Sequence, residues 1–182
     1  EEATEIWTWM KKLSIVEFEK VYDMLGIKYD SYNGESFYSD KMPAVIEEIK
    51  EKNIGKMDDG AYIVDLKPYG LTPLIIVKSN GTTTYATRDI AAARYRKKTY
   101  DFYKNIYVVA SEQNLHFQQW KQVLKLMGDE WADDCIHVNF GLISLKDGAL
   151  STRQGRVLKL EDVLNKAIEK TRDIIEKRNP NL

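Results

Sequence analysis

The stretch TTTYATRDIAAARYR, residues 82–96, changes from residues typical of strands to residues typical of helices within about two positions. Threonine and tyrosine favour extended structure, whereas three consecutive alanines favour a helix. The sequence therefore predicts a strand that ends near Thr87 and a helix that runs from Arg88 to about Lys98. Thr87 is the expected N-cap of this helix, and the alanines would allow the helix to lie close to a sheet.

Strands and helices are predicted to alternate around this junction. Apolar runs bounded by turn residues predict single strands in DDGAYIVDL (58–66), NIYVVAS (105–111) and CIHVNFGLISL (135–145), and a hairpin of two strands in PLIIVKSNGTTTYAT (73–87), which turns at Ser79-Asn80-Gly81. The run 105–111 is continuously apolar, as in strands that are buried on both faces. A helix over 112–127 separates the last two strands. This order predicts βαβ units, and hence an α/β fold with a Rossmann-like, mainly parallel sheet.

Amphipathic helices are predicted near both ends of the chain. Residues 3–25 read as two helices or one broken helix, with Ser14 as a possible N-cap and Gly26 as the C-terminal cap. A further helix is expected over about 41–52. The closing helix is LEDVLNKAIEKTRDIIEKR, and its expected core positions are Val163, Leu164, Ile168, Ile174 and Ile175.

The composition excludes several classes of protein. Lys+Arg is 27 and Asp+Glu is 28, so the chain has no overall basic field for a nucleic-acid backbone. Cys135 is the one cysteine, which excludes an intrachain disulfide and predicts a reducing, cytoplasmic setting. No apolar run reaches the ~18 residues of a membrane helix, and no His/Cys/carboxylate spacing predicts a metal site. The chain does not begin with Met, so we expect an excised segment.

Two helix N-termini that follow predicted strands are candidate ligand sites. At the first, Asp89 has two possible roles: it complements the helix dipole, or it joins Tyr85 in holding a polar, cationic ligand. At the second, Ser111 and Glu112 are explained as a helix cap and a dipole partner. Gln113 and His116 have no such explanation, although a capped surface helix with a satisfied histidine would also fit.

A third candidate is the loop LSTRQGRVLKL, residues 150–160. Its hydroxyls, guanidinium groups and backbone amides suit phosphate oxygens, but a solvated turn would have the same composition. The loop lacks the spacing of a P-loop, and the Gly-x-Gly-x-x-Gly pattern occurs nowhere in the chain. The loop alone therefore does not decide between a phosphate site and a turn.

Taken together, these segments resemble the catalytic core of arginyl-tRNA synthetases, which are class I aminoacyl-tRNA synthetases. The resemblance rests on Tyr-x-Thr-Arg-Asp (85–89), Ser-x-Gln-x-x-His (111–116), HVNFGLI (137–143) and Ser-Thr-Arg-x-Gly (151–155), in the order of the family. The family activates arginine with ATP and transfers it to tRNA-Arg. The resemblance implies arginine, ATP and tRNA-Arg as partners, neither membrane nor DNA, Mg²⁺ with ATP as co-substrate, and no tightly bound cofactor.

The resemblance also implies roles for particular residues. Tyr85, Asp89 and Gln113 match residues that bind arginine, with Asp89 facing the guanidinium. The matches to the ATP site are His116, Phe140 and Gly141 on the adenosine side, and Ser151, Thr152, Arg153, Gln154 and Gly155 in the KMSKS-type loop at 150–156. Gln154 stands where many members have lysine, so Arg153, Arg156 or an outside lysine would meet the leaving phosphates.

The His-x-Gly-His signature of class I synthetases does not occur in the sequence, and His116 and His137 are its two histidines. We therefore expect residues 1–56 to be a helical connecting segment, and 57–182 to be the second half of the Rossmann-like catalytic domain with its closing helix. The isolated segment is expected to be inactive. Two alternatives stay open: a non-catalytic arginine- or nucleotide-binding module derived from this fold, and an unrelated nucleotide-binding α/β domain.

Overall fold

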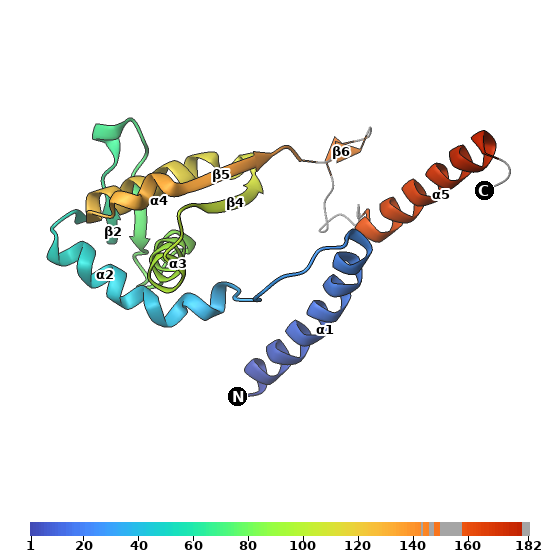
Figure 1. The fold of residues 1–182 in the computed structure, drawn as a ribbon. Coiled ribbons are helices and arrows are strands. Elements are labelled where there is room, and N and C mark those ends of the chain that lie inside the picture. The colour runs from blue at the N-terminus through green and yellow to red at the C-terminus, as the bar shows by residue number, and fades with distance from the viewer. Residues whose placement is uncertain (143, 146–147, 150–157, 180–182) are drawn as a thin grey trace. The chain divides into compact units, whose positions relative to one another are not determined.

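The computed structural model describes residues 1–142, 144–145, 148–149 and 158–179 (Figure 1). The chain divides into two compact units, one formed by residues 1–32 with 143–182 and the other by residues 33–142. The elements of the second unit, in chain order, are η1 (Glu35–Lys41), α2 (Met42–Glu51), β1 (Gly55–Asp58), β2 (Ala61–Val64), η2 (Lys67–Tyr69), β3 (Leu74–Val77), α3 (Tyr85–Tyr100), β4 (Asn105–Ala110), η3 (Ser111–Gln113), α4 (Asn114–Met127), η4 (Glu130–Asp134) and β5 (Cys135–Phe140).

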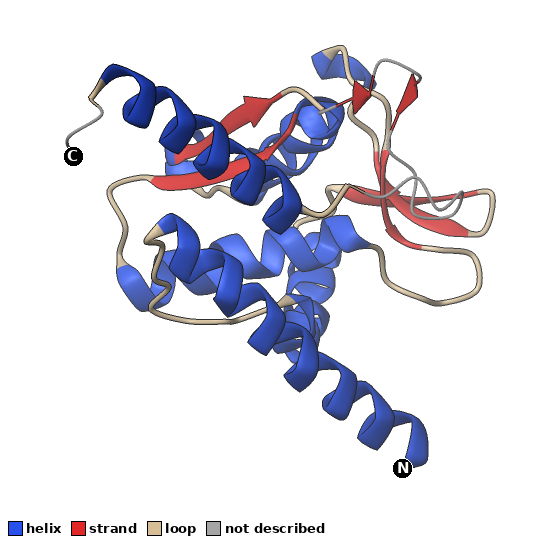
Figure 2. Cartoon of the chain, turned by 90° about the vertical axis from the view of Figure 1, so that its right-hand side faces the viewer, coloured by secondary structure: helices blue, strands red, loops and turns tan. Residues whose placement is uncertain are grey.

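The described strands form small sheets of both types. Strands β1, β2 and β3 form an antiparallel sheet in that order, so the predicted strand 58–66 is a tight β1–β2 turn followed by β2. Strands β4 and β5 lie side by side and pair in parallel (Figures 1 and 2). In this pair Asn105 lies opposite Cys135 and Ala110 opposite Phe140. The α/β class is confirmed. In the described residues the parallel part of the fold is this one pair.

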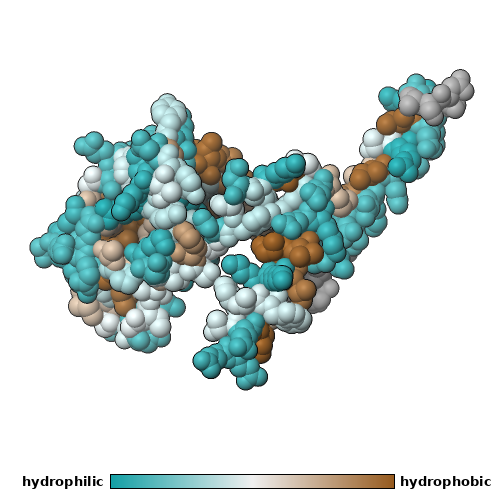
Figure 3. All heavy atoms as spheres, turned by 60° about the horizontal axis from the view of Figure 1, so that its bottom comes forward, coloured by the Kyte–Doolittle hydropathy of each residue, from teal (hydrophilic) through white to brown (hydrophobic). Residues whose placement is uncertain are grey.

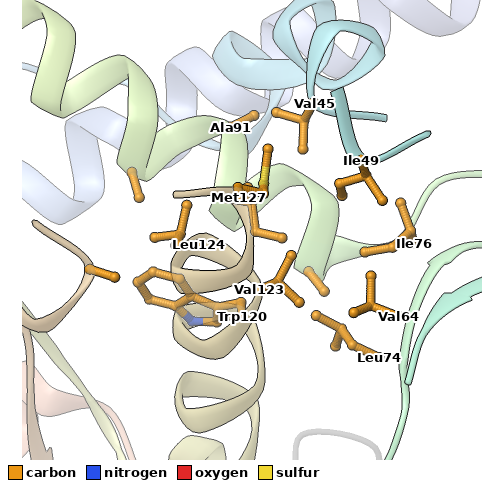
Figure 4. Packing of buried hydrophobic residues seen from close by; sticks show 14 of the residues in the cluster. Val45, Ile49, Val64, Leu74, Ile76, Ala91, Trp120, Val123, Leu124 and Met127 are labelled. Atoms are coloured by element: carbon orange, nitrogen blue, oxygen red, sulfur yellow. The ribbon is translucent and has the colours of Figure 1, made fainter. Parts of the chain in front are cut away.

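Helix α4 supplies the centre of the hydrophobic core. Trp120, Val123, Leu124 and Met127 are almost completely buried and follow the spacing of one helix face. Figure 4 shows Val123 and Met127 on the side of the helix that faces α2, β2 and β3. Leu115, near the start of the helix, is exposed. Gly128 ends the helix with a φ of 90°, as expected for a C-terminal glycine cap.

The junction between β3 and α3 differs from the prediction. The chain does turn at residues 79–81, but beyond the turn only an isolated bridge joins Thr83 to Val77, and α3 already begins at Tyr85. The reason is the position of two threonine hydroxyls. Thr84 donates to the carbonyl of Ile75, and Thr87 donates to the carbonyl of Ile76. These bonds attach the first turn of α3 to β3, where a second hairpin strand was expected.

The prediction that 105–111 is buried on both faces is wrong for the described residues. In β4, Tyr107 and Val109 are partly buried and contact the core, whereas Ile106 and Val108 are 61% and 67% exposed. Val138 and Phe140 continue the exposed face on β5. The apolar run therefore reflects two apolar faces, of which the core of this unit covers one.

The other unit contains α1 (Glu2–Leu25), β6 (Ser144–Leu145), β7 (Gly148–Ala149) and α5 (Leu160–Arg178). Helix α1 is continuous. Ser14 does not cap a second helix, because its hydroxyl bonds the carbonyl of Met10 within the helix. Gly26 ends α1 with a φ of 66°, as predicted.

The predicted core positions of the closing helix are not buried. α5 has no buried residue, and Val163, Ile168, Ile174 and Ile175 are exposed. Hydrophobic patches accordingly reach the surface along α5 (Figure 3). The bounds of the helix match the prediction, so the amphipathic period was enough to locate it. Among the described residues, however, nothing buries the apolar face of the helix.

None of the helices in the described residues is long and apolar enough to cross a membrane. In the same part of the chain, no three His, Cys, Asp or Glu side chains gather closely enough to hold a metal ion.

Candidate functional site

A cavity of about 620 Å³ opens beside the start of α3 and α4. Its walls come from η1, α3, β4, η3 and α4. The lining residues are Glu35, Tyr85, Asp89, Arg96, Tyr107, Val109, Gln113, His116, Phe117 and Trp120. Four of the residues predicted for the site, Tyr85, Asp89, Gln113 and His116, are therefore brought together, although two come from each of two separate strand-to-helix junctions.

Helix α3 presents Tyr85, Asp89 and Arg96 to this cavity. Their spacing of four and seven residues places them on one face of a helix. Because α3 begins at Tyr85 and not at Arg88, Thr84 takes the N-cap position and Thr87 is buried. Asp89 consequently lies beyond the first turn of the helix. The effect of the helix dipole falls off within that first turn, so it is weak at Asp89. The alternative that Asp89 serves only the helix dipole loses its structural basis.

The carboxylate of Asp89 is hydrogen-bonded to His116. Nε2 of His116 lies 2.6 Å from Oδ2 of Asp89, with the imidazole buried and the carboxylate side chain 44% exposed. The ring of Tyr85 covers the imidazole, with centroids 4.6 Å apart. A buried ring thus holds one oxygen of a carboxylate that faces an open cavity.

The polar segment before α4 does not form the predicted cap. Residues Ser111–Gln113 form a short 3-10 turn, α4 begins at Asn114, and no side chain caps its N-terminus. The turn directs Gln113 toward the cavity, one turn from His116. Helix capping did not explain Gln113 and His116. Both residues line the cavity.

Arg96 places a second charge in the cavity wall. Its guanidinium lies over the rings of Tyr38 and Tyr107, at 5.4 and 5.3 Å from their centroids. Burial raises the pKa of the Tyr107 phenol well above its usual range, so this ring stays neutral. A cation held between two rings in this way is stabilised by the cation–π interaction.

Glu35 closes the wall from η1. Its carboxylate accepts a hydrogen bond of 2.6 Å from Nη1 of Arg88, the residue that precedes Asp89. Glu35 itself is largely exposed, while Arg88 is mostly buried. This ion pair connects η1 to α3 across 53 positions of sequence. Of the two carboxylates that line the cavity, Glu35 is therefore paired with an arginine, and Asp89 has no arginine partner among the described residues.

The remaining predicted residues lie elsewhere. Phe140 ends β5 and is 50% exposed, and Phe140 and Gly141 do not line the cavity. Ser151, Thr152, Arg153, Gln154 and Gly155 lie outside the described residues. Their predicted roles in an ATP site stay predictions.

Sequence reasoning missed Arg96, Tyr107 and Glu35 as cavity residues. Arg96 had a detectable signal, since it falls on the same helical face as Tyr85 and Asp89. Tyr107 alternates with the exposed residues of β4, which becomes informative only once the core is known. Glu35 carried no local signal, because its place depends on a contact with Arg88.

The chain matches known proteins over its whole length. The family model described as tRNA synthetases class I (R), catalytic domain, matches residues 1–182. The chain is 63% identical over 182 residues to an arginine–tRNA ligase of Halothermothrix orenii and 58% identical over 181 residues to that of Clostridioides difficile. In both comparisons the whole chain is covered, and it spans 32% of the length of the relative.

Solved structures agree with these matches. The crystal structure of arginyl-tRNA synthetase from Plasmodium falciparum superposes with a TM-score of 0.79 at 28% identity, over the whole chain and 31% of that protein. The Thermus thermophilus arginyl-tRNA synthetase shares the fold, with a TM-score of 0.72 over 88% of the chain and 33% of that protein, at 19% identity. The chain therefore belongs to the family of class I (R) tRNA synthetase catalytic domains.

Proposed function

We propose that this chain forms the arginine-binding part of an arginine–tRNA ligase, which activates arginine with ATP and transfers it to tRNA-Arg. The observation that carries the proposal is the cavity in which Tyr85, Asp89 and Gln113 converge. All three were assigned to an arginine pocket from sequence, and they come from two junctions that are more than twenty residues apart. The relatives named above, of which the chain spans 32%, are themselves arginine–tRNA ligases.

The chemistry of the cavity suits a guanidinium. Asp89 supplies a partly exposed carboxylate, and carboxylates accept the planar N–H fork of a guanidinium through directed hydrogen bonds. Tyr85 adds an exposed aromatic ring beside it, a surface on which a guanidinium stacks. A lysine ammonium would satisfy the charge but not the planar geometry, which gives the pocket a basis for choosing arginine.

ATP and tRNA-Arg are assigned to neighbouring parts of the protein. We assign the adenosine side to His116, Phe140 and Gly141, and the ATP phosphates to residues 151–155. Mg²⁺ would enter with the ATP phosphates. The formal net charge of −1 fits a segment whose contacts with tRNA lie largely in other domains. We place the enzyme in the cytoplasm.

We further propose that β4 and β5 are two strands of a mainly parallel Rossmann-like sheet that the longer protein completes. The apolar residues exposed on one face support this proposal, because strands buried on both faces are typical of parallel sheets. We keep the predicted boundary of the helical connecting segment at residue 56 as part of the same proposal.

Calorimetric titration of L-arginine into the intact synthetase that contains this chain tests the arginine pocket. Asp89→Asn removes the negative charge while keeping the shape of the side chain, and we expect an affinity loss of roughly a hundredfold, as for a charged hydrogen bond worth about 1.5–3 kcal/mol. Asp58→Asn, at the exposed end of β1, is the matched control and should leave the affinity unchanged.

Two results would decide against the proposal or narrow it. An unchanged affinity of the Asp89→Asn variant would refute the assignment of this carboxylate to arginine. Arginine binding without formation of arginyl-adenylate, measured by ATP–pyrophosphate exchange in the intact protein, would instead support the non-catalytic binding module.

A further inference from the structure

The contact between His116 and Asp89 determines which atoms of the carboxylate are available to a ligand. An ionised carboxylate accepts hydrogen bonds and donates none, so the proton between the two groups belongs to Nε2 of His116. Among the described residues, this is the one hydrogen bond that the Asp89 carboxylate makes. One of the two lone-pair positions of Oδ2 is therefore used by the protein, and both positions of Oδ1 are left for a ligand.

The other nitrogen of the same imidazole indicates its charge. Nδ1 of His116 is buried and has no hydrogen-bond partner in the described part of the chain. A proton on Nδ1 would be a buried donor without an acceptor, which is costly. A bare lone pair is tolerated better. The geometry therefore favours the neutral ring with its proton on Nε2, and Asp89 keeps its full negative charge.

We propose that His116 is a positioning residue that sets the specificity of the cavity, by fixing Asp89 through Oδ2 while leaving Oδ1 and one negative charge for a guanidinium. This inference rests on the arginine pocket proposed above. Tyr85 contributes by covering the imidazole, which restricts the rotation of the ring. In this arrangement, a ligand guanidinium meets Oδ1 with both acceptor positions free and Oδ2 with one position already used by His116.

The same contact makes the cavity sensitive to acid. Protonation of His116 would place an imidazolium 2.6 Å from Oδ2 and cancel the charge that attracts a cationic ligand. The other charged or titratable groups of the cavity are Glu35, Tyr85, Arg96 and Tyr107. Glu35 is paired with Arg88, and burial keeps Tyr107 neutral. Histidine is the side-chain type that changes charge between about pH 5 and pH 8, and His116 is the histidine that lines the cavity.

Binding of L-arginine to the intact synthetase at two pH values tests the proposal. Between about pH 7.5 and about pH 5.5, we expect the affinity of the wild-type protein to fall by roughly tenfold, because a histidine proton competes with the ligand. His116→Gln keeps an N–H donor for Asp89 but does not titrate. We expect the affinity of this variant, whatever its value at about pH 7.5, to change by less than about twofold over the same range.

A control and a second measurement separate positioning from a purely structural role. His137→Gln changes the second histidine, which bonds the carbonyl of Val109 away from Asp89, and should keep the wild-type pH dependence. Titration of the wild-type protein in buffers of different ionisation enthalpy should show proton release on arginine binding at about pH 6. A protein in which His116 merely fills space would bind arginine without releasing a proton.

Nuclear magnetic resonance of the histidine ring nitrogens tests the same proposal in the wild-type protein, without any substitution. We expect the neutral form of His116 to show a protonated Nε2 and an unprotonated Nδ1. The opposite tautomer, or a pH dependence that persists in His116→Gln, would overturn the inference. A wild-type protein that binds no arginine at either pH would overturn the arginine pocket, while the nitrogen shifts would still report whether His116 holds Asp89.

Discussion

The hydroxyl of Thr87, in the first turn of α3, donates a hydrogen bond of 2.7 Å to the carbonyl oxygen of Ile76 in β3. Thr87 is completely buried, so no water replaces this bond when it is removed. Because α3 carries both Tyr85 and Asp89, the bond also fixes the side of the cavity that the helix forms. A residue expected to cap a helix instead joins that helix to a strand.

Removal of this hydroxyl should destabilise the fold measurably. We expect Thr87→Val, which keeps the branched shape, to lower the free energy of unfolding by about 1–2 kcal/mol. The variant removes the hydroxyl donor and leaves the buried carbonyl of Ile76 without this hydrogen bond. Thr87→Ser keeps the hydroxyl and removes a methyl group. In urea unfolding followed by circular dichroism, we expect the free energy of unfolding to be highest for the wild type, lower for Thr87→Ser and lowest for Thr87→Val. This order would show that the hydrogen bond contributes more than the methyl group.

The contact between Arg94 and Glu48 predicts a dependence of stability on pH. Arg94 binds Glu48 with two guanidinium nitrogens, and this hydrogen bonding lowers the pKa of Glu48. A carboxyl whose pKa is depressed in the folded state stabilises the fold above its unfolded pKa of about 4.3, and this stabilisation is lost as the pH falls through the folded pKa.

We therefore expect Glu48→Gln to lower the free energy of unfolding by about 1–2 kcal/mol at about pH 7, with the difference from wild type shrinking below about pH 4. Burial raises the pKa of Asp129, which also contacts Arg94, but Asp129 is present in both proteins. Glu47→Gln disrupts an exposed ion pair with Lys50, which solvent screens, and should change the free energy of unfolding much less than Glu48→Gln. Equal losses at both positions would contradict the prediction.

Gly55 is required by its distance from Tyr62. A Cβ atom at position 55 would lie 2.5 Å from the ring carbon Cζ of Tyr62, which is closer than van der Waals contact permits. We expect Gly55→Ala to displace the ring and to lower the free energy of unfolding by about 1–3 kcal/mol. Gly34→Ala is the control, because nothing lies within 4 Å of its added Cβ. Thermal denaturation of the two variants should separate them by several degrees.

The single cysteine offers a probe of the folded state. Cys135 is buried, and burial raises the pKa of its thiol to about 11. Because the thiolate is the reactive form, the native chain at about pH 8 should react with a thiol reagent at least ~100-fold more slowly than the chain in denaturant. Rapid labelling of the folded chain would show that β5 opens locally at its first residue.

Local sequence patterns located most of the elements correctly. The amphipathic period of the closing helix predicted its bounds at residues 160–178, and glycines marked the ends of α1 and α4, because each of these features acts within one or two helical turns. Polar residues placed just after predicted strands marked Tyr85, Asp89, Gln113 and His116 as candidates, and the resemblance to the family assigned them to a ligand site. In the structure the two junctions line one cavity, although β3 and β4 belong to different sheets in the described residues.

Contacts between distant segments determined the rest. The start of α3 depends on carbonyls of β3, the exposure of Ile106 and Val108 depends on what covers β4, and Glu35 reaches the cavity through an arginine 53 residues away. The sequence by itself determined the residue types that can hold a guanidinium and their place after two strands. The tertiary structure alone placed His116 2.6 Å from Asp89, because packing α3 against α4 closes a separation of 27 residues that no local pattern encodes.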